Sequence, residues 1–155
     1  MSDIDFTIAC WAFVTGVGTQ GMVTKWNTTG NQRGWWVGTF STAFELFVSS
    51  NGSLSPGVAW SSTYTTSTWY LVVAWHDSIA NTINIQVNNG TPVSVSHPLG
   101  VLDNTAGTFL GKAESGDQFA GRIDEVGVWK RVLTVAERTA LYNSGNGITY
   151  PFVGT

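Results

Sequence analysis

Charged residues are scarce in this sequence. The chain of 155 residues holds seven Lys and Arg and ten Asp and Glu, 11% of its length, against about 25% in an average soluble protein. A net charge of −3 offers no basic surface for nucleic acid or for anionic lipid. No apolar run approaches the ~20 residues that a membrane span requires. The composition therefore excludes nucleic-acid partners and membrane insertion.

Cysteine is almost absent as well, because Cys10 is the only one. A single cysteine excludes an intrachain disulfide and a thiolate metal cluster, and its apolar neighbours predict a small buried thiol. The first residues also lack a signal peptide, since Asp3 and Asp5 stand where a basic start and an apolar stretch are needed. We expect an extracellular surface or a virion only if the chain is part of a larger assembly, and the location is otherwise open.

Hydroxyl, glycine and aromatic residues are abundant. The chain holds 20 Thr, 14 Ser and 18 Gly, and its residues are 43% hydrophobic and 13% aromatic. Such a composition is not that of a disordered chain, and hydroxyl groups supply the surface polarity that charges usually supply. The length predicts one domain over residues 1–155.

Period-two alternation of apolar residues dominates the chain and predicts about eleven short strands. The clearest are residues 6–14, 22–26, 35–39, 44–49, 58–61, 69–76, 82–87, 92–95, 109–111 and 119–129. Two Asn-Gly signals, Asn51-Gly52 and Asn88-Asn89-Gly90, predict hairpin turns. Short strands at these intervals are typical of a two-sheet β-sandwich.

One helix is predicted near the end of the sequence, at about residues 135–143. Thr134 and Glu137 match the capping box, in which each side chain satisfies a backbone donor near the other. Leu141 lies on a weakly apolar stripe, and Gly145 stands where a left-handed C-terminal cap is expected.

Five segments occur in a familiar order. They are Phe6-Thr7-Ile8-Ala9-Cys10-Trp11-Ala12, Trp69-Tyr70-Leu71-Val72-Val73-Ala74, Ile83-Asn84-Ile85-Gln86-Val87-Asn88-Asn89-Gly90, Phe119-Ala120-Gly121-Arg122-Ile123-Asp124-Glu125-Val126 and Trp129-Lys130-Arg131-Val132-Leu133-Thr134. In this order they resemble the laminin G-like family of the concanavalin A-like lectin/glucanase superfamily. The resemblance implies an all-β fold, an antiparallel two-sheet jelly-roll sandwich. Because this fold hosts many activities, the function has to be argued from the site.

The sequence departs from that family at its start. Members carry an extra strand before the Phe-Thr-Ile strand, whereas only five residues precede Phe6 here. The resemblance therefore implies that the sandwich lacks an edge strand, or that a neighbouring chain or a missing segment supplies one. A homo-oligomer or a virion partner covering the first strand is the corresponding expectation.

Catalysis is not expected. Glycoside hydrolysis needs two carboxyl groups that flank the bond, and Asp124 and Glu125 are adjacent on a strand, where neighbouring side chains point to opposite faces. Glu114 and Asp117 lie in a turn, and no Gly-x-Ser-x-Gly nucleophile motif occurs. We expect a protein that is not an enzyme and requires no cofactor.

Calcium is the one ion that the resemblance suggests, because laminin G-like and pentraxin-like relatives can hold Ca²⁺ at the rim of the sandwich. The candidate ligands are Asp77, Asp103, Asn104 and Asp117. Ca²⁺ takes six to eight oxygen ligands, so these loops would have to converge. The alternative is that the same side chains form local turns.

Aromatic residues are the remaining candidates for binding, since sugar rings stack their C–H faces on indole and phenol rings. Trp35 and Trp36 are adjacent on a strand, so one of them must point away from the core. We expect Trp36, Trp60, Tyr64, Trp75 and Asp77 to form a ligand-binding surface. The alternative is that most of the eight Trp fill the core.

The sequence thus predicts a non-catalytic recognition or adhesion module that binds glycan or another extracellular surface. A structural surface component of a virion, such as a capsid decoration or tail protein that also adheres to host glycans, is the alternative. A β-glucanase is a third hypothesis.

Overall fold

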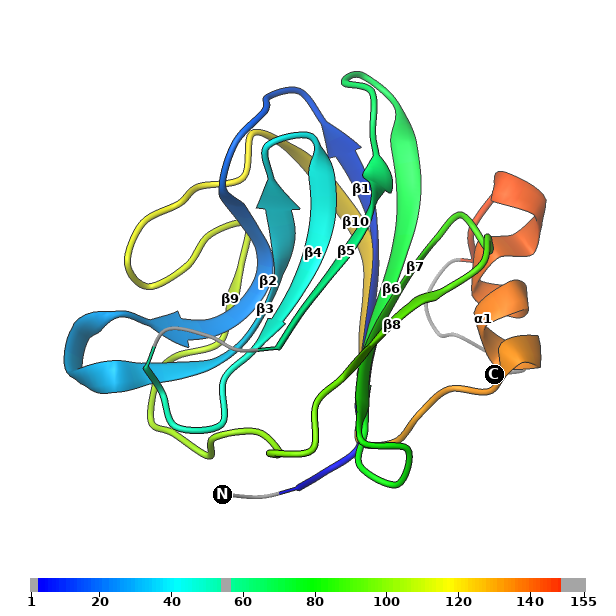
Figure 1. The fold of residues 1–155 in the computed structure, drawn as a ribbon. Coiled ribbons are helices and arrows are strands. Elements are labelled where there is room, and N and C mark those ends of the chain that lie inside the picture. The colour runs from blue at the N-terminus through cyan, green and yellow to red at the C-terminus, as the bar shows by residue number, and fades with distance from the viewer. Residues whose placement is uncertain (1–2, 54–56, 149–155) are drawn as a thin grey trace.

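Two antiparallel five-stranded sheets face each other in a computed structural model, which describes residues 3–53 and 57–148 (Figure 1). Sheet I has the order β10-β1-β6-β7-β8, and sheet II has the order β5-β4-β3-β2-β9. The sandwich and its single short C-terminal α-helix confirm the fold class expected from the sequence.

The strands fall close to the predicted ranges. Those of sheet I are β1 (Phe6–Val14), β6 (Trp69–Asp77), β7 (Thr82–Val87), β8 (Val93–Ser96) and β10 (Gly121–Trp129). Those of sheet II are β2 (Gln20–Asn27), β3 (Gln32–Phe40), β4 (Ala43–Val48), β5 (Gly57–Thr63) and β9 (Phe109–Leu110). Two short 3-10 helices, η1 (Thr29–Asn31) and η2 (Asn143–Gly145), complete the described elements.

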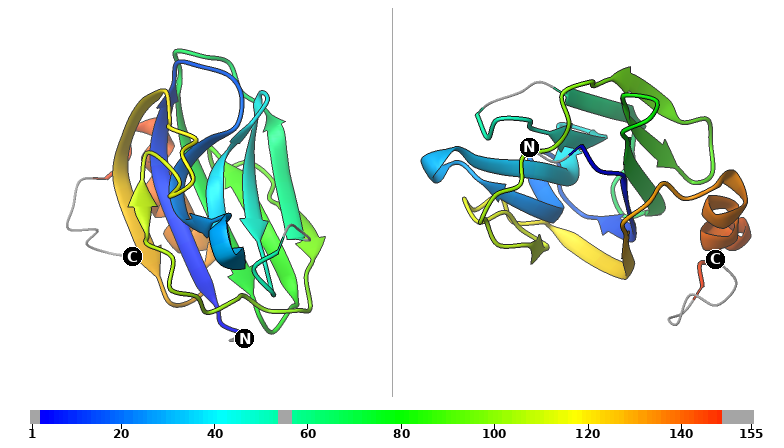
Figure 2. Two further views of the ribbon diagram at one scale, coloured as in Figure 1. Left: turned by 90° about the vertical axis from the view of Figure 1, so that its left-hand side faces the viewer. Right: turned by 90° about the horizontal axis from the view of Figure 1, so that it is seen from below.

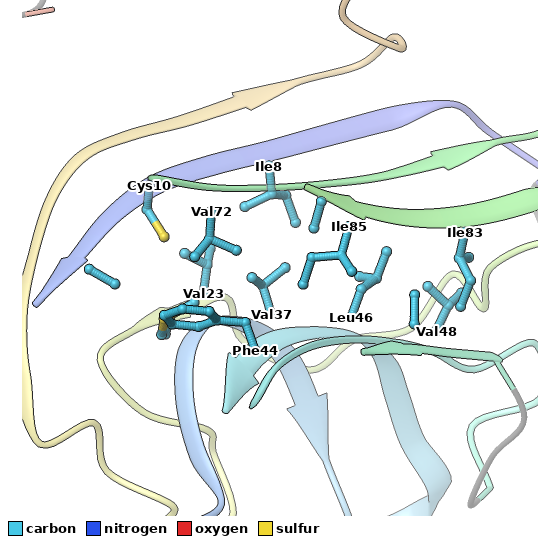
Figure 3. Packing of buried hydrophobic residues seen from close by; sticks show 14 of the residues in the cluster. Ile8, Cys10, Val23, Val37, Phe44, Leu46, Val48, Val72, Ile83 and Ile85 are labelled. Carbon is cyan, nitrogen blue, oxygen red and sulfur yellow. The ribbon is translucent and has the colours of Figure 1, made fainter. Parts of the chain in front are cut away.

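The core lies between the two sheets, where alternate strand residues interdigitate (Figure 3). Ile8 and Cys10 enter it from β1, and Val37 and Leu46 enter it from sheet II; all four are fully buried. Cys10 is a free thiol inside this core, which confirms the prediction of a buried thiol, and burial raises its pKa to about 12.

The outer face of sheet I is covered by α1 (Val135–Tyr142), as the two views of Figure 2 show. Leu133 and Leu141 pack there against a layer of apolar side chains from β1 and β6. The capping box is present, since Thr134 Oγ1 accepts the Glu137 amide and the Glu137 carboxylate accepts the Thr134 amide. The left-handed cap is Asn143 (φ 44°) rather than Gly145.

The two turn signals have different outcomes. Asn88 and Asn89 both adopt positive φ, and Gly90 N–H donates to Val87 C=O at 2.9 Å, so a tight hairpin turn links β7 and β8 as predicted. Asn51-Gly52 does not form such a turn, because β4 ends at Val48 and β5 begins at Gly57. Gly52 instead packs against the backbone carbonyl of Asn31, where a Cβ would clash.

The first strand is not at an edge of its sheet. β1 pairs with β10 on one side and with β6 on the other. The expectation that a neighbouring chain covers the first strand is therefore wrong, because the strand from the C-terminal part of the chain already occupies that place.

A β-bulge interrupts β10. Ala9 pairs with Gly127, whereas Trp11 pairs with Asp124, so β10 holds one residue more than β1 over this stretch. Glu125 is in the left-handed region with φ 48°. The extra residue allows Ile123 and Val126, three positions apart, both to pack against the core.

No helix among the residues described is both long and apolar enough to cross a membrane.

Candidate functional site

The outer face of sheet II carries a group of aromatic side chains around one carboxyl group. Strand register places them, because Trp36 of β3 pairs with Phe47 of β4, and Glu45 of β4 pairs with Trp60 of β5. Paired residues of antiparallel strands project on the same face. Leu46 points the opposite way into the core, so Glu45 and Phe47 are on the outer face.

Glycine at position 38 makes room for the Trp36 ring. Gly38 pairs with Glu45, and a Cβ at position 38 would clash with Nε1 of Trp36. The indole of Trp36 therefore lies along the strand and reaches toward the carboxyl group of Glu45. Trp36 is 3% exposed, and its Nε1 finds no acceptor at hydrogen-bond distance among the described residues.

Glu45 is a buried carboxyl group beneath this aromatic surface. Its side chain is 1% exposed, and its Oε2 accepts a hydrogen bond from Trp60 Nε1 at 3.1 Å. Burial raises the pKa of Glu45 to about 7, and the hydrogen bond from Trp60 Nε1 offsets part of that shift. Glu45 therefore changes charge near neutral pH.

Two large rings at this face are open to solvent. Phe40 and Trp60 are about half exposed, and their rings are nearly parallel, 4° apart, with centroids separated by 6.0 Å. Trp26 and Phe47 contact each other edge to face beside Trp36. We name this surface the sheet II site. Its cavity of about 180 Å³ is lined by Thr19, Trp26, Trp36, Phe40, Glu45, Phe47 and Asp117, and Trp60 contacts two of these residues, Phe40 and Glu45.

Of the five residues expected at a ligand-binding surface, the structure brings Trp36 and Trp60 together. Tyr64 lies in the core, where it contacts Phe44 and donates through its hydroxyl group to backbone carbonyls. Trp75 lies beneath α1, with the guanidinium of Arg138 over its ring at 4.3 Å. Asp77 is outside the site as well, because it accepts the amides of residues 79 and 80 in a turn.

Phe40 and Glu45 were missed by the sequence analysis. The alternation of apolar residues over 44–48 predicts the direction of Glu45. Phe44, Leu46 and Val48 face the core, so residue 45 must face away from it. A lone carboxylate on the outer face of a strand in a chain with so few charges could have marked the site.

The four residues expected at a calcium site do not form one cluster. Asp103 lines an apolar groove beside Lys25, Asn104 accepts the Ala106 amide within its own turn, and Asp117 lies at the rim of the sheet II site. Over residues 3–53 and 57–148, no group of three or more His, Cys, Asp or Glu side chains could hold a metal ion.

The expectation for Asp124 and Glu125 is wrong, because their side chains do not lie on opposite faces. Both line a cavity of about 200 Å³ on the outer face of sheet I, next to the end of α1. The bulge is the physical reason, since its extra residue breaks the period-two alternation.

We name this second cavity the bulge site; it is lined by Trp11, Trp69, Asp124, Glu125, Gly145 and Asn146. Both acids are held by backbone amides. Asp124 Oδ1 accepts the amide of Glu125 at 2.8 Å, and Glu125 Oε2 accepts the amide of Ile148 at 2.9 Å. The indole Nε1 of Trp11 is buried and has no hydrogen-bond partner in the described part of the chain.

Comparison with known families gives one match. Residues 1–137 match the model of the Laminin_G_3 family, described as concanavalin A-like lectin/glucanases superfamily. No curated protein sequence matches the chain significantly.

Solved structures similar to this one include three that concern carbohydrate or receptor binding. A sialidase carbohydrate-binding module of Ruminococcus gnavus bound to α2,3-sialyllactose has a TM-score of 0.71 and 16% identity, over 88% of this chain and 81% of that one. A Bacteroides ovatus protein assigned to carbohydrate binding has a TM-score of 0.69 and 17% identity, over 86% of this chain. The binding domain of botulinum neurotoxin serotype C1 has a TM-score of 0.66 and 15% identity, over 91% of this chain.

At these identities the similarities establish the shared fold. The chain spans 39% of the Bacteroides ovatus protein and 36% of the neurotoxin domain.

Proposed function

The chain belongs to the Laminin_G_3 family of the concanavalin A-like lectin/glucanases superfamily, and from this membership we propose that it is a non-catalytic module that binds glycans through the sheet II site. One observation carries the proposal. The exposed and nearly parallel rings of Phe40 and Trp60 stand beside a buried indole N–H and a buried carboxyl group.

These groups are complementary to a sugar ring. The C–H face of a pyranose packs on the aromatic rings of Phe40 and Trp60. Its hydroxyl oxygen accepts from Nε1 of Trp36, the donor that lacks a partner among the described residues. A buried donor without an acceptor is costly, so a ligand hydroxyl that satisfies it gains affinity and orientation.

The proteins of similar fold support this choice of ligand. The Ruminococcus gnavus module was solved with α2,3-sialyllactose, and a related botulinum neurotoxin depends on interaction with two ganglioside molecules for cell entry. The Ruminococcus gnavus module is matched over 81% of its length, so in that protein a sandwich of this kind was solved with a bound sugar.

We propose binding without hydrolysis because in each site at least one of the two acidic side chains is held by another group of the protein. In the sheet II site the side chain of Glu45 is buried and accepts a hydrogen bond from Trp60 Nε1. In the bulge site both acids accept backbone amides. A glycosidase needs an acid and a second carboxylate directed at the same bond.

Trp60→Ala tests the proposal. Binding to a glycan array and titration calorimetry with the best oligosaccharide are compared for the wild type, Trp60→Ala and the control Ile79→Ala, which removes another exposed apolar side chain. We expect Trp60→Ala to weaken binding at least about tenfold and Ile79→Ala to leave it unchanged. Absence of binding to any glycan, or equal binding by Trp60→Ala, refutes the proposal.

Two further arms of the same experiment address calcium and catalysis. Repeating the titration in calcium and in a chelator tests the predicted rim Ca²⁺, because a calcium-dependent site loses affinity in the chelator. Reducing-sugar release from the bound oligosaccharide tests hydrolysis, and release by the wild type that Glu45→Gln abolishes would replace the binding module with an enzyme.

A further inference from the structure

The bulge site repeats the chemical set of the sheet II site with other residues. Each site has a buried indole N–H without an acceptor among the described residues, a carboxyl group beside it and a second, exposed indole ring. In the bulge site these are Trp11, Glu125 and Trp69, which correspond to Trp36, Glu45 and Trp60. The two sites differ in one respect. The carboxyl group of Glu45 in the sheet II site is buried beneath Trp60, whereas the carboxyl group of Glu125 in the bulge site is not buried beneath Trp69.

The indole N–H of Trp11 and the carboxylate of Glu125 both lie close to Gly147. A Cβ on Gly147 would lie 2.9 Å from Nε1 of Trp11 and 2.5 and 2.9 Å from the carboxylate oxygens of Glu125. Gly147 has φ 67° and no side chain, so its backbone packs closely beside these atoms, and Nε1 of Trp11 is buried. Trp11 is 8% exposed, and its ring is fixed by stacking on Tyr142 at 6.0 Å.

This arrangement selects a hydroxyl group as the ligand. The Trp11 indole can only donate a hydrogen bond, and the carboxylate of Glu125 can only accept one. A hydroxyl group accepts from the first and donates to the second. An ammonium group has no lone pair for Trp11, and a carboxylate has no proton for Glu125.

The charge of the site disfavours an anionic ligand. Asp124 and Glu125 lie side by side, and neither forms an ion pair with another described residue. Two carboxylates repel an anionic sugar such as a sialic acid.

Trp69 supplies the flat surface. Its side chain is 38% exposed and rests against Phe13, with ring centroids 5.5 Å apart. The guanidinium of Arg122 lies over the Phe13 ring at 5.3 Å. The indole is therefore supported from the side of the sheet and open toward the cavity.

We propose that the bulge site is a second glycan-binding site, which binds an uncharged pyranose by its hydroxyl groups and stacks it on Trp69. The proposal rests on the proposed function, glycan binding, and adds a second binding site at another place on the molecule. This second site is formed by a different set of residues. The sugar places one hydroxyl between Trp11 Nε1 and the Glu125 carboxylate, and the free oxygen of Asp124 accepts from a neighbouring hydroxyl.

The indole N–H resonances provide a direct test in the full chain. ¹⁵N-labelled protein is titrated with the methyl glycosides of glucose, galactose and mannose, with N-acetylneuraminic acid and with glucosamine, and the Trp11 and Trp36 indole peaks are followed. Trp11→Phe and Trp36→Phe assign the two peaks. We expect a neutral glycoside to shift both peaks in the wild type.

Variants of each site separate the two proposals. In Trp60→Ala we expect the Trp11 peak to shift as in the wild type, and in Trp69→Ala we expect at least an about tenfold weaker response of that peak with the Trp36 response unchanged. Glu125→Gln, which keeps an acceptor for the Ile148 amide, provides a second variant and should weaken the Trp11 response in the same way.

The outcomes are distinguishable. A Trp11 peak that no neutral glycoside moves, or whose shift survives both Trp69→Ala and Glu125→Gln, refutes the bulge site while leaving the sheet II site standing. A Trp36 peak that does not move, with a responsive Trp11 peak, refutes the sheet II site alone. Shifts of the Trp11 peak by glucosamine or N-acetylneuraminic acid, but by no neutral glycoside, overturn the assignment to an uncharged sugar.

Discussion

A carboxyl group enclosed by indole rings, as Glu45 is, couples the stability of this protein to pH. The folded state holds the proton of Glu45 up to a pKa of about 7, whereas the ordinary value is 4.5. Burial is the main cause, because the charged form loses its hydration beneath Trp60. Between these two values the folded protein keeps a proton that the unfolded chain has already released.

Glu45→Gln is predicted to stabilise the protein above neutral pH. The free energy of unfolding of the wild type falls as pH rises through the window from 4.5 to about 7, with a total loss on the order of 3 kcal/mol. Gln keeps an acceptor for Trp60 and has no charge to bury, so its profile lacks this decline. Urea unfolding at pH 5 and pH 8 measures the difference.

Glu114→Gln is the control for that measurement, because Glu114 is an exposed carboxylate. Its pH profile should follow the wild type. If Glu45→Gln also follows the wild type, the carboxyl group of Glu45 is not the source of the pH dependence.

Individual residues were predictable where strand alternation alone decides their direction. Trp36 and Trp60 could be placed at a surface from the sequence, since each lies next to strand residues that the alternation directs into the core. Tyr64 and Trp75 could not, because one is buried by the rings of Phe44 and Tyr70 and the other by α1. The contacts of Tyr64 with Phe44 and of Trp75 with Arg138 join different elements of the chain, which local patterns do not reveal.

Among the elements, β10 shows how a regular pattern can mislead. A strict period of two places Asp124 and Glu125 on opposite faces, and the bulge places them at one cavity. The spacing of Ile123 and Val126 contained the signal, because two core residues three positions apart do not fit an unbroken strand. The bulge thus creates a site that a regular strand could not present.

Thr134→Ala is predicted to destabilise the protein by about 1 kcal/mol, the usual cost of losing an N-cap side chain. Thr134 Oγ1 accepts the Glu137 amide at the start of α1, and α1 in turn covers the outer layer of sheet I. Urea unfolding of the wild type, Thr134→Ala and the control Thr134→Ser measures the effect. Ser retains the hydroxyl group, so equal stability of the Ala and Ser variants would contradict a stabilising cap.

At the scale of the whole molecule, the sandwich could be predicted because nearly every strand alternates and the turns separate them regularly. The neighbour of β1 could not, because β10 follows it by more than a hundred residues and only tertiary pairing joins them. The protected first strand removes one argument for an assembly partner, since that partner would have had to supply a strand that the chain itself provides.

The two sites open on opposite faces of the sandwich, which has a consequence for larger ligands. The sheet II site is on the outer face of sheet II, and the bulge site is on the outer face of sheet I beside α1. One sugar ring cannot contact both, but one protein molecule can join two polysaccharide chains. If both proposals hold, a single chain of this protein is bivalent.

Bivalence predicts that the wild type cross-links particles coated with the neutral polysaccharide it binds best. Trp60→Ala and Trp69→Ala each remove one site and leave the other, so each should still bind to the particles and should fail to aggregate them. Light scattering measures the aggregation, sedimentation of the particles measures the binding, and excess methyl glycoside should reverse both. Aggregation that persists in both single variants would mean that cross-linking comes from association between protein molecules, because a protein with one glycan site cannot bridge two particles by itself.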